Sequence, residues 1–202
     1  MNWKPLFEEL CFRMLGNRAM WPRLLLGVVL SFLPLLNLFA FGYLYRYTNQ
    51  IRMSGDLELP NWEDWNGLLS DGLKFLVCWL VYWLLPILLI TSLHILLIKV
   101  ELGLLGKILL PVGSLWFTLL FSAALYRMQA REHLKALLEL SLILNMTKVL
   151  LRPLVLPMLV FYGFHILVSP LYGLSFFIGF LLILSYTVVC IKTMEQSKRR
   201  AL

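Results

Sequence analysis

Long runs of apolar residues without charge dominate the pattern along this chain. No Asp, Glu, Lys or Arg lies between Arg23 and Arg46, between Lys74 and Lys99, between Lys107 and Arg127, or between Arg152 and Lys192. The hydrocarbon core of a bilayer is about 30 Å thick and roughly 20 helical residues cross it, so each run is long enough for a membrane helix. The last run is long enough for two, and Ser169, Pro170 and Gly173 near its middle predict a hairpin turn.

The first apolar run, residues 24–45, is interrupted by Pro34, with Asn37 just beyond it. Proline removes a helical hydrogen bond and clashes with the preceding turn. We therefore expect this segment either to cross the membrane as one kinked helix or to dip in and return as a re-entrant pair of short helices. A re-entrant segment needs neighbouring protein groups that satisfy its backbone.

The positions of the basic residues favour the re-entrant arrangement, because Lys and Arg gather on the cytoplasmic side of a membrane protein. Of the 18 Lys and Arg residues, this arrangement puts 16 on one side and two, Lys99 and Lys107, on the other. Five full crossings would divide the same 18 residues into six and 12. The charge pattern thus predicts that the N-terminus, residues 56–74 and the C-terminus share the cytoplasmic side.

Three amphipathic stretches precede or separate the apolar runs, and we expect each to form a helix in the membrane interface. The second follows Asn61, a good N-cap, and the third covers about residues 131–148 with a Leu-rich face. In the first, apolar residues recur at helical spacing: Trp3, Leu6, Phe7, Leu10, Cys11 and Met14.

The second amphipathic stretch carries two tryptophans, Trp62 and Trp65, on its apolar face. Aromatic rings of this kind suit the headgroup region, where the ring is buried and its N–H stays wet. Glu63 and Asp64 fall in the first helical turn, where carboxylates favour the positive end of the helix dipole. We therefore predict that Trp62, Trp65 and Asp64 anchor an interfacial helix.

A short sequence match suggests that the chain is duplicated. Leu44-Tyr45-Arg46 and Leu125-Tyr126-Arg127 occupy corresponding places, each at the end of an apolar run and before an amphipathic stretch. Internal repeats of this kind are common in membrane proteins. The pattern predicts two repeat halves, about residues 21–98 and 108–191, within a single membrane domain of residues 1–202.

Composition supports a membrane protein and excludes an ordinary soluble domain. Hydrophobic residues make up 60% of the chain and charged residues 14%, and the mean hydropathy is +0.82. The net charge of +7 comes from residues that flank apolar runs, so anionic lipids explain it better than nucleic acid. The three cysteines have neither the spacing of a zinc site nor that of a disulfide framework.

Two histidines, His94 and His165, lie inside apolar runs. An ionisable group within the membrane is a candidate for a functional site. One hypothesis is that either histidine ligates haem or another pigment. The alternative is a neutral imidazole hydrogen-bonded to a backbone carbonyl or to a nearby hydroxyl, such as that of Thr91, Ser92 or Tyr162, which would leave the protein without a cofactor.

A stripe of small hydroxyl residues recurs every fourth position in the third apolar run: Ser114, Thr118 and Ser122. Small residues let membrane helices approach closely, so we predict a helix contact there, with a path for a polar solute as the alternative.

Acidic residues gather between positions 56 and 71, where carboxylates could hold a hard cation. Their spacing matches no EF-hand loop, and helix capping together with a solvated face explains them without metal. No nucleotide-binding loop, HExxH or GxSxG arrangement occurs in the chain. We therefore expect neither a catalytic site nor a metal site.

Three segments resemble a prokaryotic membrane-protein family of unknown function: Pro34-Leu35-Leu36-Asn37, Gly42-Tyr43-Leu44, and LPNWEDWNGLLSDGLK from Leu59 to Lys74. The family's signature is LPxWxDWxxLxxDGLK, and the resemblance covers about residues 21–86. Beyond Pro86 only the layout is similar. The resemblance implies an all-α polytopic membrane bundle in a prokaryotic cytoplasmic membrane, and it implies no chemistry.

These observations predict a non-enzymatic membrane protein that acts as an accessory, assembly or interaction subunit. Its expected partners are membrane lipids and either other membrane proteins or further copies of itself. A small-solute transporter or lipid-handling protein is the main alternative, because broken apolar segments build binding sites in transporters. A pigment- or haem-binding subunit is the second alternative.

Overall fold

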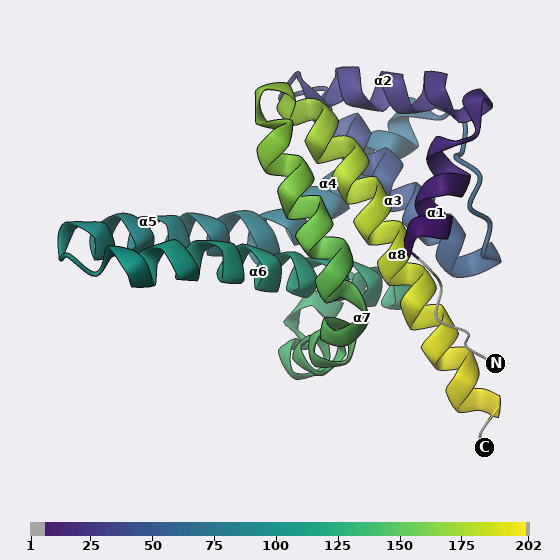
Figure 1. Cartoon of the computed structure of the whole chain (residues 1–202). Helices are drawn as coiled ribbons and strands as arrows, with labels where there is room; N and C mark the ends of the chain where they lie inside the picture. Colours follow the sequence, from purple (N-terminus) through teal and green to yellow (C-terminus); the bar gives the residue numbers. More distant parts are fainter. Residues whose placement is uncertain (1–6, 201–202) are drawn as a thin grey trace. The chain divides into compact units, whose positions relative to one another are not determined.

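The computed structural model describes the backbone of residues 7–200, and their side chains except those of residues 15, 169 and 197–200. Helix accounts for 87% of the structure, and no strand occurs among the described residues. Figure 1 shows the helices in order: α1 (Phe7–Leu15), η1 (Arg18–Met20), α2 (Trp21–Ser31), α3 (Asn37–Ser54), α4 (Trp65–Trp79), η2 (Leu80–Leu84), α5 (Leu85–Lys99), α6 (Gly103–Arg131), η3 (Leu134–Leu138), α7 (Leu140–Leu167), η4 (Ser169–Leu171) and α8 (Tyr172–Arg200).

Within the described residues, four helical segments are long and apolar enough to cross a membrane. They are Trp65–Lys99, in which α4, the π-helical turn η2 and α5 run on without a break, Gly103–Arg131, Leu140–Leu167 and Tyr172–Gln196. The shortest has 25 residues, and at a rise of 1.5 Å per residue it is about 37 Å long, more than a bilayer core requires. The predicted all-α membrane fold is confirmed.

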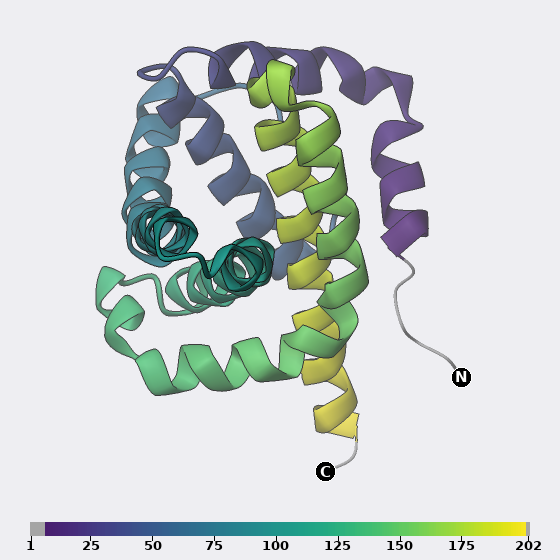
Figure 2. The same ribbon diagram turned by 60° about the vertical axis from the view of Figure 1, so that its left-hand side comes forward.

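The first apolar run is broken at the predicted place. Helix α2 ends at Ser31 and α3 begins at Asn37, with Pro34 in the irregular link between them. The 11 residues of α2 extend about 16 Å, which is too short to cross a bilayer. Figures 1 and 2 show α2 lying across one end of α3 and α8, so the segment is two helices at an angle and not one kinked span.

The chain forms two compact units. Unit 1 contains the described residues up to Phe75 and from Leu156 onward, and unit 2 contains Leu76–Val155. These units do not coincide with the predicted repeat halves, residues 21–98 and 108–191, because unit 1 is built from both ends of the chain. The duplication itself stays a prediction.

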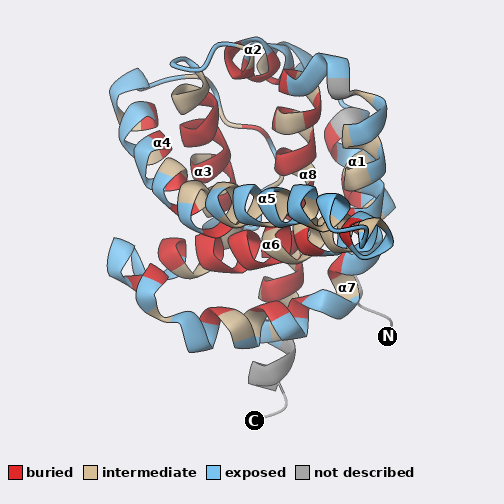
Figure 3. Cartoon of the chain, turned by 90° about the vertical axis from the view of Figure 1, so that its left-hand side faces the viewer, coloured by how far each residue is buried: buried red, intermediate tan, exposed pale blue. Residues whose placement is uncertain are grey.

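Unit 1 has an aromatic core, whose buried members include Tyr43, Tyr47, Phe75, Phe177 and Phe180. Figure 3 shows buried residues on α3 and α8, which contribute most of these rings. In unit 2, α6 supplies much of the core, whereas no residue of α5 is buried. The exposed residues of α5 are mostly apolar, as a surface that faces lipid requires.

The second amphipathic stretch does not form the separate interfacial helix that we predicted. Residues 55–64 are irregular, and α4 begins at Trp65, three residues after the helix start that Asn61 would give. Asp64 is the residue before this helix, and its Oδ1 accepts a hydrogen bond of 3.2 Å from the Gly67 N–H. Asp64 therefore caps the helix in place of Asn61.

The third amphipathic stretch, residues 131–148, is likewise not one helix. Helix α6 continues to Arg131 and ends at Glu132, which has a left-handed backbone conformation (φ 57°). A short 3-10 turn, η3, follows, and the rest of the stretch is the start of the long helix α7. The first stretch is helical from Phe7 to Leu15, and its predicted positions Trp3 and Leu6 lie outside the described residues.

Two glycines let α3 approach α4 within unit 1. A Cβ atom at Gly42 would stand 1.9 Å from the backbone oxygen of Leu68, and one at Gly72 would stand 2.0 Å from the backbone oxygen of Leu38. No side chain fits at either position unless the helices move apart. The Gly42–Gly72 crossing therefore sets the distance between these two helices.

Candidate functional site

The two intramembrane histidines have different surroundings. In unit 1, His165 Nδ1 lies 3.0 Å from the hydroxyl oxygen of Ser175, which joins α7 to α8. This is the hydroxyl contact of our plain alternative, although the partner is Ser175 and not Tyr162. In unit 2, the buried His94 Nδ1 has no hydrogen-bond partner among the described residues and lies close to Gly106 of α6.

The hydroxyl stripe on α6 lies largely in the interior of unit 2. Thr118 and Ser122 are buried, and each hydroxyl donates a hydrogen bond of 2.8 Å to the carbonyl four residues earlier. Ser114 is half-buried and bonds to the Pro111 carbonyl at 2.9 Å. Thr118 also accepts a hydrogen bond of 3.0 Å from the indole N–H of Trp83 on η2, which is a contact between helices.

The two tryptophans of the predicted anchor lie in different settings. Trp62 is half-buried in the irregular segment and stacks on Tyr43, with ring centroids 4.1 Å apart and an interplanar angle of 12°. Its indole N–H donates to the Arg23 carbonyl at 3.0 Å. Trp65 begins α4, is 44% exposed, and meets the ring of Phe39 edge-on. Of the two, Trp62 is held by protein contacts and Trp65 is the more available to a membrane surface.

A row of side chains on α3 holds the irregular segment in place. Tyr43 donates to the Pro60 carbonyl at 2.8 Å, Tyr47 to the Leu57 carbonyl at 2.9 Å, and Gln50 to the Glu58 carbonyl at 3.0 Å. Arg46 on the same helix donates to the Glu63 carbonyl at 3.1 Å. We call these four residues, Tyr43, Arg46, Tyr47 and Gln50, the loop clasp. They replace the hydrogen bonds that a helix would give to these carbonyls.

The charged residues beside the loop clasp pair with one another. Arg46 lies 3.2 Å from the Asp64 carboxylate and 3.5 Å from that of Asp71, which also pairs with Lys74 at 3.0 Å. Asp56 accepts hydrogen bonds from Gln50 and from the Glu58 N–H. Among the described residues, no group of three or more His, Cys, Asp or Glu side chains is arranged to hold a metal ion. Asp56, Asp64 and Asp71 are thus engaged in holding this segment in place.

Our sequence interpretation missed the loop clasp. Its members lie at positions 43, 46, 47 and 50, the spacing of one helix face. Polar and aromatic residues at this spacing at the end of an apolar run could have indicated a polar contact.

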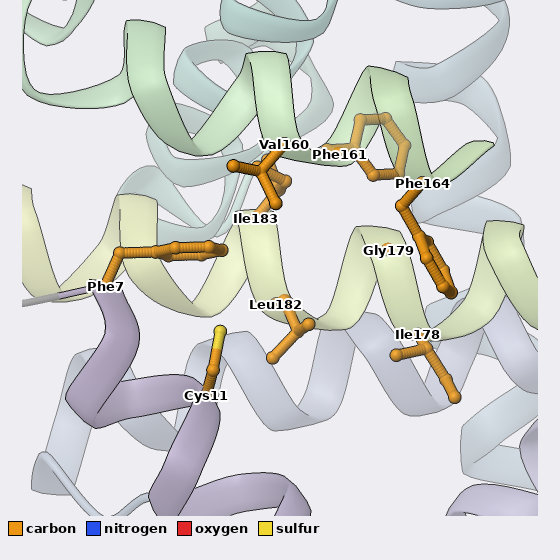
Figure 4. A pocket seen from close by; sticks show the side chains of 9 residues that line it. All are labelled: Phe7, Cys11, Val160, Phe161, Phe164, Ile178, Gly179, Leu182 and Ile183. Carbon is orange, nitrogen blue, oxygen red and sulfur yellow. The ribbon is translucent and has the colours of Figure 1, made fainter. Parts of the chain in front are cut away.

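Unit 1 contains an apolar pocket between α1, α7 and α8, which we call the α1 pocket. Its volume is about 180 Å³, and it is lined by Phe7, Cys11, Val160, Phe161, Phe164, Ile178, Gly179, Leu182 and Ile183. Figure 4 shows the side chains of α1 facing those of α7 across α8. The lining can hold an apolar group and gives a polar ligand no oxygen or nitrogen side-chain atom to bind.

Packed aromatic rings shape the α1 pocket. A Cβ atom at Gly179 would stand 2.1 Å from the Phe161 ring, so that ring lies directly on the backbone of α8. Phe7 meets Tyr186 edge-on, with centroids 5.2 Å apart, and this contact joins α1 to α8. Burial raises the pKa of the Cys11 thiol above its ordinary value, so this thiol is neutral at physiological pH. The apolar face of the first amphipathic stretch was the one sequence feature that pointed towards this pocket.

Comparisons with known proteins give a family and nothing more specific. No curated protein and no solved structure matches the chain. Residues 25–184 match the model of the family described as "Protein of unknown function (DUF4013)". This range covers 160 of the 202 residues, and it includes most of the broken first run, the loop clasp and three of the four candidate spans in full. The chain therefore belongs to DUF4013, a family of proteins of unknown function.

Proposed function

We propose that this protein is a non-enzymatic integral membrane protein that works through contacts with other membrane components, as an accessory, assembly or interaction subunit. The observation that carries this proposal is that its polar side chains bind other parts of the same protein. Arg46 pairs with both Asp64 and Asp71, the loop clasp binds backbone carbonyls, and His165 lies against Ser175. Each of these groups is engaged with another part of the fold, as structural side chains are.

The exposed apolar surface supports the same proposal. Large apolar residues of α5 are exposed in the isolated chain, among them Leu88, Leu89, Ile95 and Leu96. In a membrane this surface is covered by lipid or by another membrane helix. The partners we propose are therefore membrane lipids together with other membrane proteins or further copies of this chain, and not nucleic acid.

We further propose a prokaryotic cytoplasmic membrane as the location, with the C-terminus in the cytoplasm. The support is the division of basic residues, because four crossings leave Lys99 and Lys107 alone on the far side.

Lipid handling is a second candidate function, and the α1 pocket favours it. A wholly apolar hollow beside candidate membrane spans suits a hydrocarbon group better than a protein partner's polar surface. The pigment alternative loses His165, whose imidazole already meets a hydroxyl, and rests on His94, whose buried Nδ1 has no hydrogen-bond partner among the described residues.

Photo-crosslinking in native membranes tests the contact proposal. A photoreactive amino acid is placed at Leu89 or Leu96 of α5, which are 72% and 56% exposed, and at Met53, which is 68% exposed at the end of α3, as a control. The proposal predicts one discrete protein adduct from the α5 positions, recovered in stoichiometric amount after gentle purification, and none from Met53. Lipid adducts alone at both α5 positions, with a purified monomer that carries no protein partner, would refute the subunit role.

A further inference from the structure

The lining of the α1 pocket restricts the chemistry of an occupant. All nine lining residues present carbon or, in the case of Cys11, a neutral thiol. Water needs two to four polar partners to be stable in a cavity, and the side chains of this lining offer it no oxygen or nitrogen atom. A cavity of about 150 Å³ lined by apolar side chains is known to accept benzene, so the 180 Å³ of the α1 pocket suits a compact hydrocarbon group.

The position of the pocket along its helices indicates where that group would come from. The lining residues of α7 and α8 lie inside the candidate spans Leu140–Leu167 and Tyr172–Gln196. Phe164 is three residues from the end of α7, which is about 5 Å along the helix axis, so the pocket reaches from one end of these spans into their apolar part. Lipid tails are the most abundant apolar groups at this depth.

Helix α1 covers one side of the pocket, and it has the amphipathic character of an interfacial helix. Leu10 and Met14 are buried in the interior of unit 1, whereas Glu9 and Arg13 are exposed and pair with each other at 2.9 Å. A helix with one buried apolar face and one charged face lies where hydrocarbon meets headgroups. A lipid chain could therefore enter the pocket while its headgroup remained in the polar layer.

We propose that the α1 pocket binds part of one acyl chain of a membrane phospholipid, held between Phe7 and Cys11 of α1 and the faces of α7 and α8. This site is independent of the protein contacts proposed above. A lipid chain bound there would add apolar contacts between α1 and the helices α7 and α8, and would therefore stabilise the packing of α1.

The native Cys11 thiol reports on occupancy. The protein is purified in a detergent with a rigid steroid tail, and alkylation by the neutral reagent N-ethylmaleimide is followed peptide by peptide, which separates Cys11 from the buried Cys78 and Cys190. The zwitterionic lipid palmitoyl-oleoyl-phosphatidylcholine is the probe, so that no lipid charge alters thiol reactivity. At ten times its Kd, occupancy should slow alkylation of Cys11 about tenfold.

A matched control uses the neighbouring position. Phe12 is 79% exposed and points away from the pocket, about 100° around α1 from Cys11, so Phe12→Cys in a Cys11→Ala background should be alkylated at the same rate with and without lipid. An unchanged rate at Cys11, or equal slowing at both positions, would overturn the proposal. Protection by free palmitate without protection by the phospholipid would also overturn it.

Lipid counting by native mass spectrometry provides a second measurement. The parent protein should retain one phospholipid, Cys11→Trp should lose it because the indole fills the pocket, and Phe12→Trp should keep it. Retention of the lipid by a folded Cys11→Trp variant would contradict the proposed site. If that variant does not fold, the alkylation rates decide.

Discussion

At the scale of single residues, the closest approach of α3 and α4 in unit 1 is a contact of backbone with backbone. Gly42 and Gly72 face each other across α3 and α4, and each is opposed by a carbonyl oxygen that cannot rotate away. A flexible side chain could yield to a new methyl group, whereas a helix backbone cannot. A methyl group added at this crossing therefore forces one of the two helices to move.

Gly42→Ala should lower the free energy of unfolding by about 1–3 kcal/mol, the usual range for overpacking. Gly163→Ala in α7 is the control, because nothing lies within 4 Å of a Cβ atom built there. Alanine favours helix over glycine by up to about 1 kcal/mol, so this control should be neutral or stabilising. Thermal unfolding of both variants in one detergent measures the difference, and equal stability would show that the Gly42–Gly72 crossing is looser than described.

Asp64 has two roles and an unusual backbone conformation, and substitutions can separate their contributions to stability. It caps α4, it pairs with Arg46, and it has a positive φ of 54°. Asp64→Asn keeps the cap and tolerates this backbone conformation, so it loses only an exposed ion pair worth less than about 1 kcal/mol. Asp64→Ala loses the cap as well, which costs about 1 kcal/mol more. Thermal melting should rank the parent above Asn and Asn above Ala; a reversed order of Asn and Ala would exclude the capping role.

At the scale of helices, the apolar runs were predictable and the segments between them were not. Charge-free length and Pro34 each act locally, so the spans and the break between α2 and α3 could be inferred from sequence. The helix start after Asn61 was wrong because two capping signals, Asn61 and Asp64, compete there. The choice between them depends on distant donors such as Tyr43 and Tyr47, which hold residues 57–60 out of the helix.

The candidate site was less predictable than the fold. The α1 pocket depends on three helices from opposite ends of the chain, and no spacing within one segment reveals such a meeting. The hydroxyl stripe on α6 was found by its four-residue period, but its partner Trp83 lies in a π-helical turn. A π turn changes the direction of the residues after it, which periodicity cannot anticipate.

Thr118→Val tests whether the hydroxyl stripe is a helix contact. Valine has nearly the same shape and removes the acceptor for the Trp83 N–H, so unit 2 should lose about 1 kcal/mol of stability. Thr91→Val is the control, since the Thr91 hydroxyl bonds to the Ile87 carbonyl of its own helix. Thr118→Leu should cost more, because it adds bulk at a buried position. If Thr118→Leu folds normally but stops the passage of a solute, the stripe is a pathway and not a contact.

At the scale of the whole molecule, the order of the two units along the chain and the distribution of basic residues both bear on the membrane topology. Unit 1 contains both ends of the described chain, and unit 2 is the segment inserted between them. The four candidate spans all lie after residue 64, and none of them comes from the first apolar run. The central claim of our account is that this run remains on one side, as the division of 16 and two basic residues predicts.

Accessibility of single cysteines to an impermeant maleimide tests that claim most directly. Cysteine replaces Asn2 ahead of the first apolar run, Ser54 after it, or Glu101 between α5 and α6, in a Cys11→Ala background; Ser54 and Glu101 are exposed. Our account predicts that Asn2→Cys and Ser54→Cys are labelled only after the cells are permeabilised, whereas Glu101→Cys is labelled in intact cells. If intact cells label one of Asn2→Cys and Ser54→Cys while the other needs permeabilisation, the first run crosses the membrane and the account is wrong.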